Sequence, residues 1–420
     1  MPNRHLRIAV VGGGGHVGLP LSLLLASRGF RVTIIDEDRP KLQALRRGKF
    51  PFLEAGGPKL LRAVLAYAPA RRPVFSHEHR LVADCDVVIL TVGTPVDGHL
   101  NPDPQSLYNA IHQIQPFLRA GQMLVLRSTV FPGTSDKIHA KLRAAGLKVS
   151  VSFCPERIAQ GKALKELQEF PQIISGSDEA ALEVARTIFS SFASEVIELG
   201  MTEAELAKLF TNAWRYITFA VANQFYMLAT EKGLDFYRIR DGIVKHYPRA
   251  SDLPTAGFAA GPCLFKDTMQ LAAYHRQGFT IGHAAMLLNE TLPDFLIEQV
   301  KRERSLVGAR VGILGMAFKA DNDDSRDSLA YKLHKLLTYE NAIVLCTDPY
   351  IKDPSFASVE TVLASCEVLF IGCPRTAYRY LSFDGKRVVD CWGFLRSQPK
   401  GYSTCPPRKT RRAATAAMRA

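Results

Sequence analysis

The chain has 420 residues, of which 47% are hydrophobic and 22% are charged, a balance typical of a globular protein with a sizeable core. This length suggests two or three domains at roughly 100–200 residues each. The formal net charge of +13 is spread along the chain, and neither a nucleic-acid-binding module nor a basic helix with interleaved aromatic residues occurs. We therefore expect an anionic small molecule, and no nucleic acid, as the partner.

The sequence carries no signal for secretion, membrane insertion or metal binding. The N-terminus does not resemble a signal peptide, and the longest apolar run, Leu19–Ala26, is too short to span a bilayer. The eight cysteines form no Cys-x-x-Cys pair. We therefore expect a protein of the reducing cytoplasm, without a metal site.

The first predicted elements are a strand, a glycine-rich turn, a helix and a second strand. The strand Leu6–Val11 is followed by Gly13-Gly14-Gly15-His16-Val17-Gly18, a helical pattern through Leu25, a strand at Arg31–Ile35 and then Asp36. This order is typical of a dinucleotide-binding unit, in which the glycines let the backbone approach a pyrophosphate at the helix N-terminus. Asp36 would accept hydrogen bonds from the adenine ribose and repel a 2′-phosphate, which favours NAD over NADP. A glycine-rich turn in another α/β unit is the alternative.

Three further strands carry polar residues just beyond their C-terminal ends. These strands are predicted at Asp86–Val92, Gln122–Leu126 and Val149–Phe153. Thr94, Thr129 and Glu156 follow them, and open α/β sheets hold their ligands at this edge. We therefore expect the three side chains to converge on one crevice, although each alone could be a turn or cap residue.

A long helix is predicted from about Thr202 to Lys232, where apolar residues recur at helical spacing. A helix of this length in mid-chain suits a connection between domains. Lys208 and Asn212 are four residues apart, so they share one face of the helix and could point at one ligand atom. The alternative is that Lys208 is exposed and Asn212 is merely tolerated in the helix.

The segment Gly261-Pro262-Cys263-Leu264-Phe265-Lys266-Asp267 places a thiol close to an ammonium group and a carboxylate. A cysteine can form covalent adducts with a carbonyl carbon, and a neighbouring cation favours its thiolate. The alternative is a small buried hydrophobic residue in a turn. Asp267 is predicted to begin a helix toward Gln277, and another helix containing Pro293 follows.

A second α/β unit is predicted from Arg310 to about Leu395. Its strands are expected at Val311–Leu314, Ala342–Cys346, Val368–Ile371 and Arg387–Val389, with a helix that ends at Leu337. Of the phosphate-binding glycines only Gly312 and Gly315 remain, so this unit is Rossmann-like but is not expected to bind a second NAD. The tail from Pro399 is rich in Pro, Ala and Arg without periodicity, and we expect it to be disordered.

Several motifs in this order resemble those of the UDP-glucose/GDP-mannose dehydrogenase family over about residues 6–395. They are Gly13-Gly14-Gly15-His16-Val17-Gly18-Leu19-Pro20, Phe52-Leu53-Glu54-Ala55-Gly56, Gly93-Thr94-Pro95, Ser128-Thr129-Val130-Phe131-Pro132-Gly133-Thr134, Pro155-Glu156-Arg157, Lys208 with Asn212, Gly261-Pro262-Cys263 with Lys266-Asp267, and Ala317-Phe318-Lys319 with Asp323-Asp324-Ser325-Arg326. The resemblance implies an α/β fold of two Rossmann-like doubly wound domains joined by a long central helix. It also implies an NAD-binding domain at 1–200, a central helical dimerisation domain at 201–305, a C-terminal UDP-sugar-binding domain at 306–398 and a basic tail at 399–420.

The resemblance further implies a homodimer or larger homo-oligomer that oxidises the C6 hydroxyl of a nucleotide sugar to a carboxylate, with two NAD per turnover. Cys263 matches the catalytic nucleophile of the family. After the first hydride has left, the Cys263 thiolate would attack the aldehyde to give a thiohemiacetal. This adduct can lose a second hydride and become a thioester, which water hydrolyses.

The resemblance also assigns roles to side chains around the thiol. Lys208 and Asn212 would stabilise the developing oxyanion. Asp267 would act as a base through water or help to hold Lys208, and Glu156 with Thr129 would position the hydrolytic water.

By the same resemblance, two sets of binding residues are expected. NAD would be bound by Gly13, Gly15, His16, Val17, Gly18, Asp36, Thr94, Thr129 and Lys266. The UDP-sugar would be bound by Glu54, Glu156, Lys208, Asn212, Arg249, Gly257, Gly261, Lys319 and Arg326. Arg249 would reach the sugar nucleotide of the neighbouring subunit, and solvated loop charges are the alternative for Lys319 and Arg326.

Two departures from the family pattern concern the substrate. The loop before Cys263 reads Ala256-Gly257-Phe258-Ala259-Ala260-Gly261, where the family has more glycines, and alanine restricts close approach of the backbone. After the last strand, Asp390-Cys391-Trp392 stands where the family often has Asp-x-Arg.

UDP-glucose is the first expected substrate, because the Lys266-Asp267 pair resembles the UDP-glucose and GDP-mannose branches. A UDP-N-acetylhexosamine and GDP-mannose are the alternatives. Two other functional classes are a two-electron hydroxyacid dehydrogenase, whose chemistry needs no thiol, and a sugar-nucleotide-binding protein that has lost catalysis.

Overall fold

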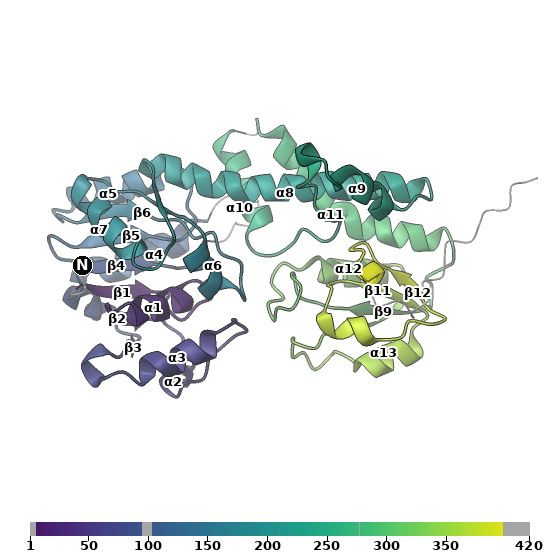
Figure 1. Cartoon of the computed structure of the whole chain (residues 1–420), viewed down its shortest axis with the longest axis horizontal. Coiled ribbons are helices and arrows are strands. Elements are labelled where there is room, and N and C mark those ends of the chain that lie inside the picture. The colour runs from purple at the N-terminus through teal and green to yellow at the C-terminus, as the bar shows by residue number, and fades with distance from the viewer. Residues whose placement is uncertain (1–5, 95–102, 277, 398–420) are drawn as a thin grey trace, which may run out of the picture. The chain divides into compact units, whose positions relative to one another are not determined.

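The computed structural model describes residues 6–94, 103–276 and 278–397. The chain forms two compact units (Figure 1). The first unit contains the chain up to Ile217 together with Ala260–Met286, and the second contains Thr218–Ala259 together with the chain from Leu287 onward. The predicted tail at 399–420 lies outside the described residues.

The first unit is built on a parallel sheet of six strands in the order β3-β2-β1-β4-β5-β6. The strands are β1 (Arg7–Val11), β2 (Arg31–Ile35), β3 (Val74–Ser76), β4 (Val87–Leu90), β5 (Met123–Leu126) and β6 (Ser150–Phe153). Most of their residues are apolar because both faces of the sheet are covered, although β6 has the sequence SVSF. A separate parallel pair consists of β7 (Gln172–Ile174) and β8 (Val196–Glu198).

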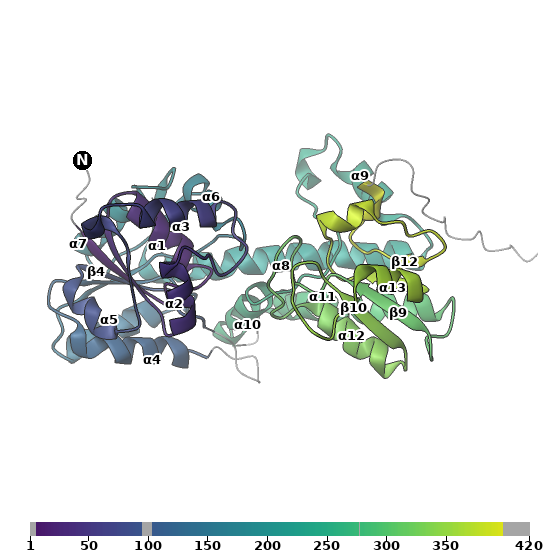
Figure 2. The ribbon, with the colours of Figure 1, turned by 90° about the horizontal axis from the view of Figure 1, so that it is seen from below.

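Helices cover both faces of this sheet (Figure 2). They are α1 (Gly18–Ser27), α2 (Arg39–Arg46), α3 (Gly57–Leu65), α4 (Gln105–Ile114), α5 (Thr134–Ala144), α6 (Ala163–Glu169) and α7 (Glu179–Phe189). One hydrophobic core lies between the sheet and α1, α3, α6 and α7, and a second lies between the sheet and α4 and α5. The strand order and the two cores confirm the doubly wound architecture predicted for this part of the chain.

A helix of 31 residues, α8 (Met201–Glu231), runs from the first unit into the second and confirms the predicted long helix. At a rise of about 1.5 Å per residue it is roughly 46 Å long. Three shorter helices follow it in the chain: α9 (Phe236–Val244), α10 (Leu264–Tyr274) and α11 (Thr280–Lys301). Pro293 lies inside α11, as predicted.

The second unit contains a parallel sheet of four strands in the order β10-β9-β11-β12. The strands are β9 (Arg310–Leu314), β10 (Ile343–Thr347), β11 (Val368–Ile371) and β12 (Arg387–Val389). The helices α12 (Leu329–Tyr339) and α13 (Val359–Ser365) lie on opposite sides of this sheet (Figure 1). This arrangement confirms the second Rossmann-like unit.

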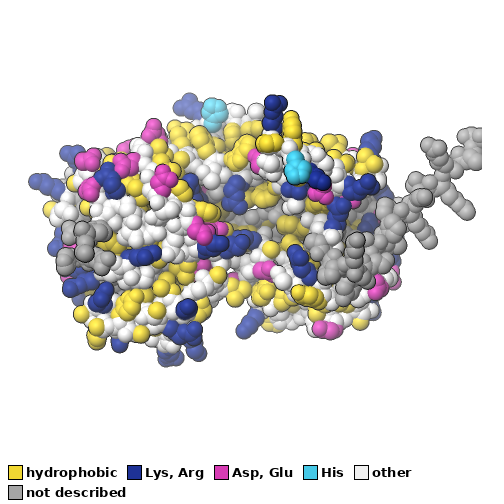
Figure 3. All heavy atoms as spheres, viewed as in Figure 1, with side chains coloured by type: hydrophobic (Ala, Val, Ile, Leu, Met, Phe, Trp, Pro, Cys, Tyr) yellow, Lys and Arg dark blue, Asp and Glu magenta, His cyan; other side chains and the backbone are white. Residues whose placement is uncertain are grey.

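The face of the molecule drawn in Figure 3 is not uniformly basic. On the side seen in Figure 3, lysine and arginine side chains are spread among acidic and apolar ones. Within the described ranges, no helix combines the length and the apolar character that crossing a membrane requires.

Candidate active site

The glycine-rich turn after β1 has no room for larger side chains. A Cβ atom on Gly13 would lie 2.6 Å from the carbonyl oxygen of Val10, and one on Gly18 would lie 2.6 Å from that of Gly12. The N–H groups of Gly12 and Gly13 both donate to the carbonyl oxygen of Ile35, at 2.9 and 3.1 Å. The turn therefore passes tightly from β1 to the start of α1, where main-chain N–H groups are available to a phosphate.

Asp36 closes this turn from the end of β2. Its Oδ2 accepts a hydrogen bond from the N–H of Gly14 at 2.8 Å, and its Oδ1 accepts one from Asp38 at 3.0 Å. The half-buried carboxylate thus stands beside the glycine turn, where an adenine ribose would meet it. The tight turn and the acid fit NAD. Beside them the ring of His16 lies 4.0 Å from that of Phe52, centroid to centroid.

A second cluster in the first unit joins α8 to α10. Asn212 donates from Nδ2 to Oδ2 of Asp267 at 2.5 Å, and Oδ1 of Asp267 lies 3.1 Å from Nζ of Lys266. The Asp267 side chain is fully buried, with Oδ2 hydrogen-bonded to Asn212 and Oδ1 beside the Lys266 ammonium group without a hydrogen bond of its own. Asp267 therefore orients the amide of Asn212 and pairs with Lys266, whereas the sequence predicted either a base acting through water or help in holding Lys208.

The same cluster reaches the strand ends of the sheet. Lys266 Nζ donates to the carbonyl oxygen of Thr94 at 2.9 Å, and the Thr94 hydroxyl donates to the carbonyl oxygen of Thr129 at 2.6 Å. The structure therefore brings together Thr94, Thr129, Lys266, Asp267 and Asn212, which come from four separate segments of the sequence.

Lys208 lies one turn before Asn212 on α8 and is only 8% exposed. Among residues 6–94, 103–276 and 278–397, no carboxylate forms an ion pair with it. A buried ammonium group without an acidic partner is well suited to stabilise a developing oxyanion.

Cys263 is the N-cap residue of α10, and its carbonyl oxygen accepts the N–H of Asp267 at 2.9 Å. Its side chain is exposed, while the other described cysteines are all buried: Cys85, Cys154, Cys346, Cys366, Cys373 and Cys391. Burial raises the pKa of Cys85 to about 11 and the pKa of Cys346 and Cys373 to about 12. The start of a helix stabilises a thiolate, so among the described cysteines Cys263 is the one placed to react.

Glu156 is held by an arginine that the sequence analysis did not single out. Oε2 of Glu156 accepts hydrogen bonds from Nε and Nη2 of Arg127, at 2.9 and 2.5 Å. Oε1 accepts the main-chain N–H groups of Arg157 and Ile158, at 2.7 and 3.0 Å. These four bonds use the roughly four lone-pair sites of a carboxylate. The charged Arg127 directly after a predicted strand was the signal that could have revealed this pair.

Two other buried carboxylates bind main-chain groups. Glu205, on α8, accepts the N–H of Ser135 at 2.8 Å, and Glu54 accepts the N–H of Leu164 at 3.0 Å. Burial raises the pKa of both carboxyl groups. Glu205 thereby ties α8 to the start of α5, a role the sequence did not reveal. Glu54, expected to bind the sugar, holds the start of α6.

In the second unit, Gly257 is enclosed on all sides. Its N–H donates to Oδ1 of Asn223 at 2.9 Å, and its carbonyl oxygen accepts Nδ2 of Asn223 at 3.0 Å. A Cβ atom on Gly257 would lie 2.3 Å from Cε3 of Trp392, whose indole N–H donates to the carbonyl oxygen of Ile371 at 2.9 Å. Trp392, at the position where the family often has arginine, therefore packs on the loop that leads to Cys263.

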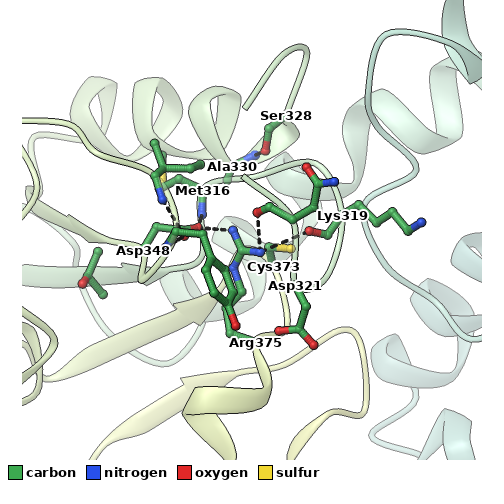
Figure 4. Close-up of polar contacts among 12 residues, drawn as sticks. Met316, Lys319, Asp321, Ser328, Ala330, Asp348, Cys373 and Arg375 are labelled. Carbon is green, nitrogen blue, oxygen red and sulfur yellow. Dashed lines mark hydrogen bonds and ion pairs between the residues drawn. The ribbon is translucent and has the colours of Figure 1, made fainter. Parts of the chain in front are cut away.

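The remaining candidates lie in loops. Lys319 and Arg326 belong to the long connection between β9 and α12. Figure 4 labels Lys319 at the right of the residues drawn as sticks. Arg326 already forms an ion pair with Asp324, with Nη2 and Oδ2 2.6 Å apart. Arg249 is exposed in a short 3₁₀ turn, and Gly261, just before Cys263, has a φ of +97° that favours glycine.

Comparison with known proteins identifies three consecutive domains of one family along the chain. Residues 6–193 match the NAD binding domain of the UDP-glucose/GDP-mannose dehydrogenase family, residues 202–291 match its central domain, and residues 312–397 match its UDP binding domain. A UDP-N-acetyl-D-mannosamine dehydrogenase of Methanocaldococcus jannaschii is 30% identical over 91% of this chain and 88% of that protein. One of Pyrococcus horikoshii is 28% identical over 94% of this chain and 98% of that protein.

Two solved structures resemble the whole chain. A UDP-glucose dehydrogenase from Pyrobaculum islandicum has a TM-score of 0.86 at 26% identity, covering 96% of this chain and 98% of that one. The UDP-D-ManNAc dehydrogenase from Pyrococcus horikoshii has the same TM-score of 0.86 at 26% identity, covering 94% and 98% of the two chains.

Proposed function

Because this chain belongs to the UDP-glucose/GDP-mannose dehydrogenase family, we propose that it oxidises the C6 hydroxyl of a UDP-N-acetylhexosamine to a carboxylate. The family makes the chain an NAD-dependent oxidoreductase that acts on a nucleotide sugar. The names of its relatives favour an N-acetylated sugar, with UDP-N-acetylmannosamine as the first choice. UDP-glucose, the first expectation from the sequence, is the second candidate, since the Pyrobaculum islandicum enzyme is as similar in structure.

The observation that carries the chemistry is an exposed thiol at the start of α10, close in sequence to the buried Asp267–Asn212 pair. When bound, NAD supplies the hydride acceptor, and the glycine turn with Asp36 would hold it. Lys208 and Asn212 would stabilise the negative charge on the C6 oxygen once the hydroxyl proton has passed to water, and collapse of this alkoxide to the aldehyde expels the first hydride. Each such donor contributes about 3 kcal/mol in other enzymes.

Cys263 would then add to the aldehyde. The thiolate sulfur forms a bond to C6, and the electron pair of the carbonyl bond moves onto oxygen, where Lys208 and Asn212 stabilise it. Return of that electron pair expels the second hydride and leaves a thioester. Water attacks the thioester carbon, the sulfur leaves with the bonding pair, and the carboxylate is released.

Asp267 and Glu156 would act as positioning residues in this scheme. Asp267 orients the Asn212 amide, and Glu156 fixes the loop beyond β6 through Arg127 and two main-chain N–H groups. Both oxygens of Glu156 are occupied by these partners, whereas Oδ1 of Asp267 has no hydrogen bond. We therefore infer that Glu156 does not take a proton directly from the hydrolytic water.

We also propose that α8 forms a homodimer contact. Five large apolar side chains on this helix are each 40–61% exposed: Phe210, Trp214, Val221, Phe225 and Leu228. At 100° per residue they lie along one stripe of the helix. A contiguous exposed apolar stripe of this kind is typical of a protein–protein interface.

The experiment that tests the function measures NADH formed per sugar consumed, using UDP-N-acetylmannosamine, UDP-N-acetylglucosamine, UDP-glucose and GDP-mannose. We expect two NADH per sugar and the highest kcat/KM with an N-acetylated UDP sugar. One NADH per sugar would refute the thioester route and support a two-electron dehydrogenase. Cys263→Ala should lose acid formation while UDP and NAD still bind, and a turnover like that of the wild type would defeat the mechanism.

A further inference from the structure

The loop that carries Lys319 is held by a buried ion pair in the second unit (Figure 4). We call residues 316–324 the nucleotide loop. Nη2 of Arg375 lies 2.5 Å from Oδ2 of Asp348, and both side chains are fully buried. Nη1 of Arg375 donates to the carbonyl oxygens of Asn322 at 2.7 Å and Lys319 at 3.4 Å. One guanidinium group thus binds two points of the nucleotide loop and the end of β10.

Asp348 has the same place in the second unit that Asp36 has in the first. Each directly follows the strand that pairs with the first strand of its unit, β10 with β9 and β2 with β1. Each accepts an N–H from the loop beyond that first strand, from Met316 to Asp348 at 2.7 Å and from Gly14 to Asp36 at 2.8 Å. Asp36 has no basic partner among the described residues, whereas Asp348 forms an ion pair with Arg375.

Close packing of the backbone after β9 and β11 allows Arg375 to reach Asp348. A Cβ atom on Gly315 would lie 2.2 Å from the carbonyl oxygen of Cys373, and one on Gly372 would lie 2.5 Å from that of Gly315. The chain segments after β9 and β11 therefore pack directly on each other, which brings Arg375 beneath the nucleotide loop. A second tie forms beside it, where the Thr376 hydroxyl donates to Oδ2 of Asp321 at 2.6 Å.

We propose that the Arg375–Asp348 pair positions the nucleotide loop so that Lys319 faces a nucleoside diphosphate, and that it closes this sheet edge to a second dinucleotide. The acid that would otherwise meet a ribose is neutralised from within, and the loop is ordered before the ligand arrives, which lowers the entropy cost of binding. A buried ion pair adds little net stability over apolar residues of similar size, so stability alone does not account for it. This inference rests on the proposed function, because it takes a UDP-sugar as the ligand.

The test uses the full-length protein and titrates UDP alone by calorimetry, with NAD as the reference ligand of the first unit. Arg375→Lys keeps a cation beside Asp348 but lacks the planar fork that reaches both carbonyl oxygens. The double variant Arg375→Met with Asp348→Asn removes both charges without leaving one buried alone. Arg379→Met, a half-buried arginine four residues further on whose guanidinium carbon lies 5.4 Å from the centroid of the Phe394 ring, is the matched control.

Removing a residue that holds a metal ligand in place typically weakens metal binding about 10–100-fold. By analogy, we expect the double variant, which loses a residue that holds the nucleotide loop, to bind UDP on the order of 10–100-fold more weakly. Arg375→Lys should fall between it and the wild type, while NAD affinity and the Arg379→Met control stay unchanged. KM for the UDP-sugar should rise more than kcat falls.

Wild-type UDP affinity in the folded double variant would overturn the positioning role. Equal weakening of UDP and NAD binding would also contradict it, because only general misfolding acts on both units. Saturation of the wild type with two NAD per chain would overturn the closure to a second dinucleotide. If the wild type bound no UDP at all, the proposed function would fail instead, so the two failures are distinguishable.

Discussion

Gly257→Ala tests the packing of Trp392 on the loop before Cys263. The new methyl group would lie 2.3, 2.5 and 2.8 Å from three atoms of the Trp392 ring, so the ring or the loop must move. Overpacking of this kind costs about 1–3 kcal/mol. The φ of +150° at Gly257 adds about 1–3 kcal/mol for a residue with a Cβ atom. We therefore expect the free energy of unfolding to fall by about 2–6 kcal/mol.

A double-mutant cycle separates the clash from the backbone strain. Trp392→Ala alone should cost less than the about 3–5 kcal/mol of a fully buried ring, because Trp392 is half-buried. In the double variant the clash is gone, so its cost should be smaller than the sum of the single costs by about 1–3 kcal/mol. Gly242→Ala is the control, since a Cβ atom there meets nothing within 4 Å and alanine is the better helix former.

The assay is equilibrium urea unfolding followed by circular dichroism, at one protein concentration for all variants. Single effects that add to within about 0.5 kcal/mol in the double variant would refute the contact between Gly257 and Trp392. A Gly257→Ala variant as stable as Gly242→Ala would refute both the clash and the strain.

Three further predictions concern the thiol, the coenzyme and the assembly. In a Cys405→Ser background, iodoacetamide near pH 8 should label Cys263 first and abolish activity in step with the labelling. The reason is that burial raises the pKa of the other described thiols. Inactivation with the label on another cysteine would contradict this prediction. Asp36→Ala should relax the preference for NAD over NADP, since the carboxylate no longer repels a 2′-phosphate, and steady-state kinetics with an unchanged NAD/NADP ratio would rule out that role. Trp214→Asp should dissociate the dimer in light-scattering measurements, because a charge would replace a 61% exposed ring of the apolar stripe, while the control Tyr380→Asp, at a 74% exposed site, should not; a dimeric Trp214→Asp protein would place the interface elsewhere.

The parts of the fold that local patterns determine were predictable. The glycine turn and Asp36 lie within one continuous segment, so their spacing alone indicates a dinucleotide-binding unit. The strands of four or five residues are rich in apolar residues, and all of them were predicted. The strands β3, β7 and β8 have three residues each, which is short for a periodicity to emerge, and they were missed, although the equally short β12 was predicted.

Side-chain pairs between distant segments were not predictable. Arg127 and Glu156 are 29 residues apart, and Arg375 and Asp348 are 27 apart, so no local spacing connects them. Arg375 follows β11 as Glu156 follows β6, yet nothing in the sequence tells whether such a residue faces a ligand or a neighbouring loop. The direct site assignments for Cys263, Lys208 and Asn212 stay predictions until the variants are measured.

The chain crosses between its two units three times, at residues 217–218, 259–260 and 286–287. Dividing the chain at a single position therefore cannot separate one complete unit from the other. A truncated protein of residues 6–193 would keep the coenzyme turn but lack α10, and with it the only exposed thiol among the described cysteines. A chimera made by exchanging one contiguous segment with a relative would likewise divide one of the two units between two proteins. An exchange intended to change the sugar preference therefore needs junctions at all three of these positions.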